Sequence, residues 1–457
     1  MIGMTIIDPA RDLGDLRALC GGAVALPSDD GYDAARQAFN LAVDQRPAAV
    51  AYPCNAQEVA AVVRFARERG LRVAPQATGH NAGPLGGLEH TILLKTSGMH
   101  GVTIDPERRI ARAEAGVLWE DVVDAAAPHG LLALHGSAPD VGVVGYSLGG
   151  GMGWLARSHG FQTNNLTAIE LVTADATLVR TDRENDPELF WALRGGGGNF
   201  GIVTAVEFKL FPIAEIYAGF MMWDWTEAER VLTAWSRWAV DAPDEVTTSF
   251  RIMQLPPLPE LPEIIRGRRL VMIDGAVQGD EAEAILAPLR ALEPELDTFA
   301  MVPAPSLVRL HQDPEEPMPF TSDSALVEEL PPAAIEALVE LAGPGSDSPL
   351  LMVELRQVGG ALGRVTPGHG ALAKLDAQFV LFMGGLAIDA DVEAAILGHA
   401  ARLKDALEPW SGAGQYLNFA EHAVDTSASY GAFTYRRLQA VKARVDPGNV
   451  IHANHAL

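Results

Sequence analysis

The sequence predicts an α+β fold in two domains. Its 457 residues are too many for one hydrophobic core and enough for two. Hydrophobic residues make up 48% of the chain, which excludes intrinsic disorder. Short helix and strand patterns alternate over the first part, whereas proline-rich breaks separate strand-like runs and alanine-rich helices in the middle. We therefore predict a first domain at 1–212, a second at 213–414, and a tail at 415–457 that returns to the first.

Capping residues and periodicity locate the individual elements. Asn55 is typical of an N-cap, Glu58 follows three residues later, and hydrophobic residues recur at helical spacing until Gly70 ends the helix. The remaining predictions are a helix at 119–127, paired strands within 166–179, a helix at 188–193, strands at 202–210, 350–355 and 379–383, and a helix at 436–444.

The composition disfavours several classes of binding partner. The formal charge of −25 disfavours nucleic acid and anionic membranes. Cys20 and Cys54 are too few for a disulfide framework or a thiolate metal cluster, and we predict no metal site. Residues 1–12 lack the pattern of a signal peptide, and the most apolar run, 379–388, is half of the roughly 20 residues of a membrane span. We expect a cytoplasmic protein whose partners are small molecules; its oligomeric state stays open.

The first glycine-containing loop, residues 75–83, follows a predicted strand and contains His80. Its backbone N–H groups are free to converge on a phosphate. The alternative is a tight loop that carries one surface histidine. The residues by themselves leave both interpretations open.

A second predicted loop, VGVVGYSLGGGMG at 141–153, contains six glycines. A backbone with so few side chains suits close approach by a flat, bulky ligand. A flexible linker is the alternative, but the interleaved Val, Tyr, Leu and Met residues are wrong for one. We favour ligand approach.

A third segment, GGGGNFG at 195–201, has the spacing GxGxxG. A Rossmann fingerprint needs a strand before this motif and a helix after it. Here a predicted helix precedes it and a strand follows, so we do not predict a nicotinamide-dinucleotide site.

Together these segments resemble the berberine-bridge-enzyme-like flavoprotein oxidases, within the vanillyl-alcohol-oxidase class that has a PCMH-type FAD-binding domain. The resemblance lies in TGHN around His80, VGVVGYSLGGGMG, LFWALRGGGGNFGIVTAVEFKL, and the terminal YLNF and YGAFTYRRLQAVKARVDPGNVI. These motifs occur in the family's order over roughly 47–211 and 415–457. The middle region is similar to the family's substrate domain only in length and texture.

The resemblance implies that 1–212 and the tail form an FAD domain of two α+β subdomains. It also implies that 213–414 form a substrate domain whose antiparallel sheet covers the flavin ring. The family's histidine at the position of His80 is bonded to the flavin 8α-methyl group, which makes the flavin a stronger oxidant. The cofactor-binding residues so implied are Gln76, Ala77, Thr78, Gly79, His80, Asn81, Ser137, Val141, Gly142, Gly145, Tyr146, Gly149, Gly150, Gly153, Ile202, Val203, Tyr416 and Asn418.

Many family members have a second flavin bond, from a cysteine in the loop before the glycine segment. This sequence has Ala138 where that cysteine aligns, and Cys20 and Cys54 lie elsewhere. We therefore expect FAD with one histidyl link and no cysteinyl link.

The catalytic residues depart from the family pattern. The tyrosine that ends the family's YxNY motif, often the base, is replaced by Phe419, which cannot titrate. Glu354 and Arg356 share one face of a predicted strand, where they either orient a polar substrate, with Glu354 as a possible base, or form an ion pair on a solvated face. Tyr416 is a further candidate. The apolar run at 378–382 suits a substrate that needs no strong base, such as a neutral amine.

The resulting expectation is an FAD-linked oxidase. It would remove hydride from a small-to-medium alcohol, amine or sugar-like substrate to flavin N5, with O2 as acceptor. The alternatives are a dehydrogenase that uses another acceptor and a non-catalytic flavin-binding protein that has lost its base.

Overall fold

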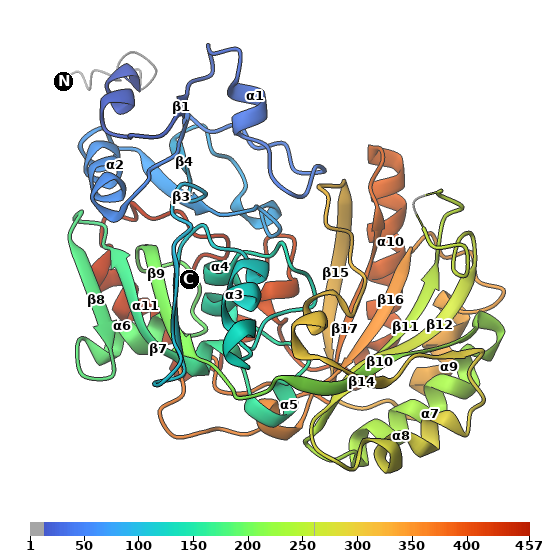
Figure 1. Ribbon diagram of the computed structural model, residues 1–457. Coiled ribbons are helices and arrows are strands. Elements are labelled where there is room, and N and C mark those ends of the chain that lie inside the picture. Colours follow the sequence, from blue (N-terminus) through green and yellow to red (C-terminus); the bar gives the residue numbers. More distant parts are fainter. Residues whose placement is uncertain (1–12, 260) are drawn as a thin grey trace.

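The computed structural model describes residues 13–259 and 261–457 (Figure 1). Residues 1–12, on which the signal-peptide prediction depends, lie outside this part. Three sheets of four, five and eight strands organise the molecule. This mixture of helices with largely antiparallel sheets confirms the predicted fold class. None of the described helices is both long and apolar enough to cross a bilayer.

The first sheet has the order β1-β2-β4-β3, and β2, β4 and β3 run parallel. Helix α2 connects β2 to β3, and the Asn55 side chain accepts the Glu58 N–H as the sequence predicts. The elements here are β1 (Val24–Ala25), α1 (Tyr32–Ala35), β2 (Ala49–Ala51), α2 (Ala56–Glu68), β3 (Arg72–Gln76) and β4 (Thr91–Lys95).

The second sheet has the order β5-β6-β9-β7-β8 and is antiparallel throughout. Helix α6 precedes the GxGxxG segment and strand β9 follows it, so the order is the reverse of a Rossmann unit. The elements are β5 (Val102–Asp105), β6 (Ile110–Glu114), α3 (Trp119–Ala126), α4 (Val143–Gly149), α5 (Ala156–His159), β7 (Leu166–Val172), β8 (Leu178–Asp182), α6 (Pro187–Leu193) and β9 (Ile202–Lys209).

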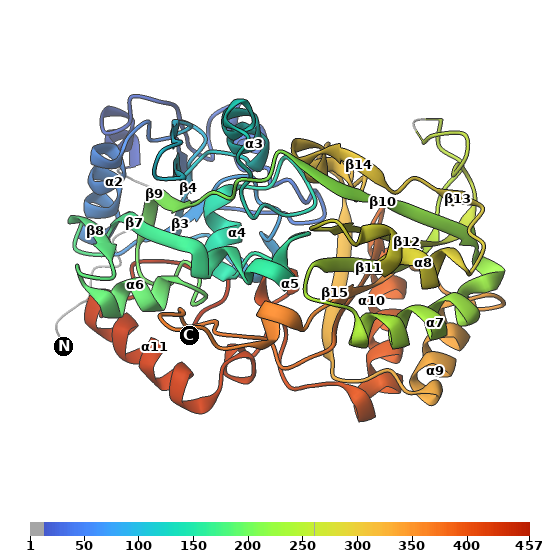
Figure 2. The ribbon, with the colours of Figure 1, turned by 60° about the horizontal axis from the view of Figure 1, so that its bottom comes forward.

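The third sheet is antiparallel, in the order β13-β10-β12-β11-β16-β17-β15, with β14 also paired to β10. Helices α7 to α10 cover one face, and the other face is turned toward the first two sheets (Figures 1 and 2). The elements are β10 (Glu215–Asp224), α7 (Ala228–Asp241), β11 (Val246–Gln254), β12 (Arg269–Val277), α8 (Ala282–Arg290), β13 (Leu296–Asp297), β14 (Ala300–Pro303), β15 (Phe320–Val327), α9 (Pro332–Ala342), β16 (Met352–Gln357), β17 (Phe379–Leu386) and α10 (Ala390–Leu407).

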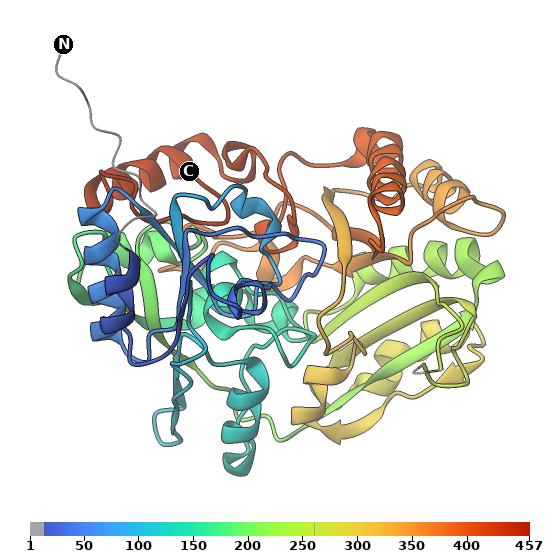
Figure 3. The ribbon, with the colours of Figure 1, turned by 90° about the horizontal axis from the view of Figure 1, so that it is seen from above.

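The tail crosses from α10 back to the first two sheets, where α11 (Ala432–Val445) packs (Figure 3). The Tyr430 hydroxyl donates to the Gly195 carbonyl at 2.8 Å, and the His452 N–H donates to the Val73 carbonyl at 2.9 Å. The tail therefore ties the third glycine segment to the first sheet.

One local prediction needs correction. The segment 141–153 is not a loop throughout, because Val143–Gly149 form helix α4. Its glycines lower helix propensity, so the helix depends on tertiary contacts. Val143 and Leu148 lie in the main hydrophobic cluster of the first two sheets and supply such contacts.

Candidate active site

The structure brings together three segments that the sequence analysis singled out separately. The Asn81 side chain donates to the Leu417 carbonyl at 3.2 Å, which joins the His80 loop to the tail. The Asn418 side chain donates to the Tyr146 carbonyl at 3.0 Å, which joins the tail to α4. The His80 loop, α4 and the tail therefore converge on the side of the first two sheets that faces the third sheet.

Close packing explains several glycines of the 141–153 segment. A Cβ added at Gly149 would lie 1.8 Å from Asn418 Oδ1, and one at Gly153 would lie 1.9 Å from the His135 carbonyl oxygen. Gly150 has φ +140°, which side chains rarely adopt. At these positions contact with the protein itself requires glycine. Gly145 has no atom within 4 Å of an added Cβ, so it leaves open space.

The His80 ring is held in a defined orientation. Its Nδ1 is hydrogen-bonded to Thr78 Oγ1 at 2.7 Å, and the ring stacks on Phe39 with centroids 3.8 Å apart. Its Nε2 lies 3.6 Å from an Asp140 carboxylate oxygen, and the His80 side chain is 30% exposed. The ring is therefore a positioned group with one accessible side.

Buried polar atoms without partners lie next to this histidine and along α4. They are Asn81 Oδ1, both carboxylate oxygens of Asp140, Tyr146 Oη and Ser147 Oγ, none of which has a hydrogen-bond partner among the described residues. Leaving a buried polar group unsatisfied costs about 1–3 kcal/mol. Such a concentration is typical of a site that binds a polar ligand, and it fits a flavin nucleotide held beside His80.

Other predicted cofactor residues already have partners in the protein. The Gln76 side chain donates to Gln45 at 3.0 Å and accepts from Lys95, whose pKa burial lowers to about 8. Ile202 and Val203 are buried in the core from β9. Their side chains contribute to the scaffold, and their predicted role in binding the cofactor rests on the backbone.

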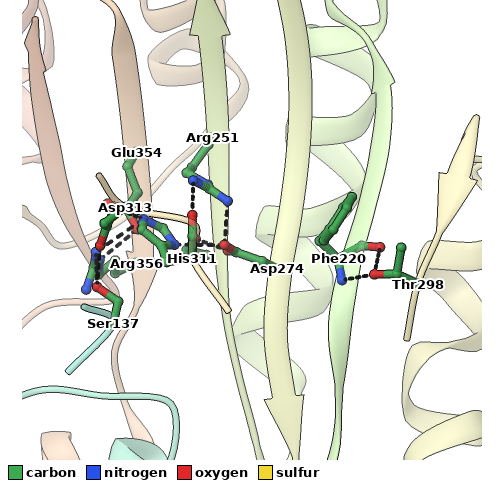
Figure 4. Close-up of polar contacts among 10 residues, drawn as sticks. Ser137, Phe220, Arg251, Asp274, Thr298, His311, Asp313, Glu354 and Arg356 are labelled. Carbon is green, nitrogen blue, oxygen red and sulfur yellow. Dashed lines mark hydrogen bonds and ion pairs between the residues drawn. The ribbon is translucent and has the colours of Figure 1, made fainter. Parts of the chain in front are cut away.

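Glu354 and Arg356 lie on the face of β16 that is turned toward the first two sheets (Figure 4). Arg356 Nε donates to Glu354 Oε1 at 2.7 Å, while the Glu354 side chain is fully buried and that of Arg356 is 17% exposed. The Arg356 guanidinium lies 4.9 Å from the centroid of the Phe419 ring. The predicted ion pair is present, but the solvated face of that alternative is wrong because the pair is buried. An alternating strand does not reveal which of its faces the rest of the chain will cover.

Sequence reasoning missed the residues that surround this pair, of which His311 is central. His311 Nδ1 lies 2.7 Å from Asp274 Oδ2, and Asp274 also accepts from Arg251 at 2.6 Å and from Ser249. Arg251 is the one charged residue of β11, and Asp274 interrupts the apolar run 270–277 of β12, a signal that sequence reading could have used. His311 lies in a loop without periodicity and gave no signal.

Burial and the neighbouring charges shift the pKa values of His311 and Glu354 in opposite directions. Burial and Arg251 lower the pKa of His311, but Asp313, Asp274 and Glu354 raise it by more. The net result is a pKa of about 9. Burial raises the pKa of Glu354, whereas Arg356 and His311 lower it more, so the carboxylate stays ionised. A carboxylate stabilised in this way is a weak base at neutral pH.

Tyr416 is buried behind Phe419, and their rings meet edge to face at 5.2 Å. Its hydroxyl accepts hydrogen bonds from the Gly151 N–H at 2.8 Å and from Asn418 at 3.2 Å. Burial raises the pKa of Tyr416 far above its usual value. These contacts support a structural role more than the catalytic role that the sequence suggested.

A small cavity of about 20 Å³ lies between the third sheet and the segment after α4. Ser137, Met152, Thr248, Arg356 and Gln357 are among its lining residues. Arg356 is thus the charged side chain of β16 that reaches this space.

Comparison with known proteins identifies an FAD binding domain and similar oxidoreductases. Residues 47–182 match the model of an FAD binding domain. Over 450 residues the chain is 28% identical to the FAD-linked oxidoreductase YvdP of Bacillus subtilis, covering 94% of this chain and 96% of YvdP. It is 37% identical over 203 residues to (R)-6-hydroxynicotine oxidase of Paenarthrobacter nicotinovorans, an alignment that spans 44% of either chain.

Solved structures agree over the whole length. 6-Hydroxy-D-nicotine oxidase from Arthrobacter nicotinovorans superposes with a TM-score of 0.84 at 28% identity, covering 96% of this chain and 98% of that one. BBE-like 1 of Physcomitrella patens has the same fold, with a TM-score of 0.84 at 22% identity over 96% and 97% of the two chains. The chain therefore contains an FAD binding domain and is similar to FAD-linked oxidoreductases over nearly its whole length.

Proposed function

We propose that the protein is an oxidase that carries FAD on His80 and oxidises a small-to-medium alcohol, amine or sugar-like compound with O2. The observation that carries the proposal is the convergence of the His80 loop, α4 and the tail around unpartnered buried polar atoms, opposite the Arg356 face of β16. The cysteines fit a single tether, since Cys20 is buried and Cys54 lies just before α2, away from the His80 loop in the sequence. Both are unpaired within the described chain, which fits a cytoplasmic location.

The residues present suit that cofactor. Bound FAD supplies a hydride acceptor at N5. The backbone from Gln76 to Asn81 would hold the pyrophosphate, while Asp140 and Tyr146 would offer hydrogen bonds near the ring. The open space at Gly145 allows close approach. His80 would bond through a ring nitrogen, and its stacking on Phe39 limits rotation.

The residues opposite the proposed flavin position limit the chemistry of the substrate. Phe419 cannot accept a proton, Tyr416 stays protonated, and Glu354 is kept ionised by Arg356 and His311. Among these residues no group is suited to take a proton at neutral pH. A substrate that gives up hydride without a strong base, such as a neutral amine, fits best. The relative named as an oxidase of 6-hydroxynicotine supports a small organic substrate.

Two experiments test the proposal. Acid precipitation of the purified protein should give a yellow pellet, and His80→Ala should give a colourless one; a colourless wild-type pellet excludes the covalent link. Anaerobic mixing with a panel of amines, alcohols and sugars should bleach the flavin with at least one amine.

The two alternatives predict different outcomes. In a dehydrogenase the flavin bleaches with substrate, but the reduced flavin reoxidises slowly in O2. A non-catalytic flavin-binding protein bleaches with no member of the panel, an outcome that the replacement of the family's tyrosine by Phe419 makes chemically reasonable.

A further inference from the structure

A cluster of six ionisable side chains lies beneath the cavity, on the inner face of the third sheet (Figure 4). Three are carboxylates, from Asp274 on β12, Glu354 on β16 and Asp313 in the loop after β14. Two are guanidiniums, and one is an imidazole. These three groups belong to Arg251 on β11, Arg356 on β16 and His311 in the same loop as Asp313.

His311 has a carboxylate on each side of its ring. Nδ1 lies 2.7 Å from Asp274 Oδ2, while Nε2 lies 3.5 Å from Glu354 Oε1 and 3.8 Å from Asp313 Oδ1. Arg356 Nη2 is 3.4 Å from Nε2, and the Trp154 ring packs at 5.7 Å. The side chains of His311, Asp274 and Glu354 are fully buried.

Charge balance decides the protonation of this ring. With a neutral imidazole, three carboxylates face two guanidiniums and the cluster carries one uncompensated negative charge. An uncompensated buried charge is costly, whereas a proton on His311 makes the cluster neutral. The two guanidiniums oppose that proton, but the carboxylates outnumber them.

The same contacts fix the Arg356 guanidinium. Its Nε donates to Glu354 at 2.7 Å, and Nη2 donates to Ser137 Oγ at 3.4 Å, which in turn donates to Asp313 at 2.9 Å. The outer part of the guanidinium lies over Phe419 and lines the cavity. A planar fork held on one side presents its remaining donors to an acceptor on the other.

We propose that His311, oriented by Asp274, is a positioning residue that acts through Glu354 to hold Arg356 at the cavity, and that Arg356 selects substrates bearing a carboxylate or carbonyl oxygen. Arg356 also disfavours a cationic amine, so an amine substrate binds in its neutral form. This inference rests on the proposed function, because it identifies the substrate class of that same site.

Benzoate serves as the probe, and its binding is read from the change in flavin absorbance without turnover. We expect benzoate to bind the wild-type protein at pH 7.5 and benzylammonium to bind at least tenfold more weakly. Arg356→Met should weaken benzoate binding at least tenfold, with Arg356→Lys intermediate because lysine keeps the charge and loses the fork. Equal binding of the two probes, or no effect of Arg356→Met, would overturn the proposed selection.

The pH dependence tests His311. Since deprotonation near pH 9 leaves the cluster negative, benzoate affinity should fall about fourfold between pH 7.5 and 9.5. His311→Gln should bind benzoate weakly without this dependence. His399→Gln is the matched control, because His399 is equally buried but bonds to the Leu341 carbonyl under α9.

A spectroscopic measurement keeps the test independent of any variant's folding. Nitrogen shifts of histidine-labelled wild-type protein should show one imidazolium that persists above pH 8, and this signal should be absent in His311→Gln where that variant folds. A spectrum with every buried imidazole neutral at pH 7 contradicts the positioning role. Flavin colour and bleaching by substrates are separate readouts, so failure of this inference is distinguishable from failure of the proposed function.

Discussion

Replacing Tyr416 by phenylalanine separates a structural from a catalytic role for this residue. The hydroxyl accepts the Gly151 N–H at 2.8 Å, and Tyr416 is 2% exposed. Tyr416→Phe leaves that buried N–H without its partner, which costs about 1–3 kcal/mol. Asn418 keeps its bond to the Tyr146 carbonyl at 3.0 Å, so we expect no further loss. For a urea m-value of about 3 kcal/mol/M, the unfolding midpoint falls by about 0.3–1 M.

The catalytic readout should behave differently. Because burial raises the pKa of Tyr416 far above its usual value, its phenol does not ionise in the assay range. The alkaline limb of kcat/KM, measured with the fastest substrate of the panel, should therefore be unchanged in Tyr416→Phe. Tyr430→Phe is a matched control, since Tyr430 is also buried and donates to the Gly195 carbonyl at 2.8 Å. Loss of the alkaline limb with an unchanged urea midpoint would refute this reasoning.

Three further predictions concern stability and cofactor retention. Gly153→Ala places a Cβ 1.9 Å from the His135 carbonyl oxygen, so we expect a loss of about 1–3 kcal/mol or more in urea unfolding. Gly145→Ala lies within α4 and meets no atom within 4 Å, so it should raise the unfolding midpoint, by up to about 1 kcal/mol in stability, while binding less flavin; normal flavin content would argue that Gly145 does not face the cofactor. Burial raises the pKa of Glu421 from 4.5 to about 7, so this group's stabilising contribution is present below pH 4.5 and lost as pH rises through 7. Glu421→Gln should then gain up to about 3 kcal/mol over wild type at pH 8 and almost nothing at pH 4.5, whereas equal gains would contradict burial as the cause.

Local signals made much of the first domain predictable. Asn55 and Glu58 sit in the chain where a helix N-terminus needs them, and the order of helix and strand around residues 195–201 excluded a Rossmann site. Helix α4 was not predictable from propensity, because Val143 and Leu148 stabilise it through contacts with distant strands.

The cluster at β16 shows the limit of sequence reading. Glu354 and Arg356 were found as a pair because strand periodicity places them on one face. Their burial, and their contact with His311, depend on how the third sheet faces the first two. His311 meets Asp274 across 37 positions of the chain, and a separation of that length leaves no periodic pattern.

We propose that the chain is a flavin-dependent oxidase, which passes the electrons of its reduced flavin to O2. The most direct test reduces the flavin anaerobically with a substrate that bleaches it, then mixes the reduced protein with O2 in a stopped-flow instrument. We predict reoxidation much faster than that of free reduced flavin, with one H2O2 formed per flavin. Reoxidation no faster than free flavin would contradict the claim and assign the electrons to another acceptor.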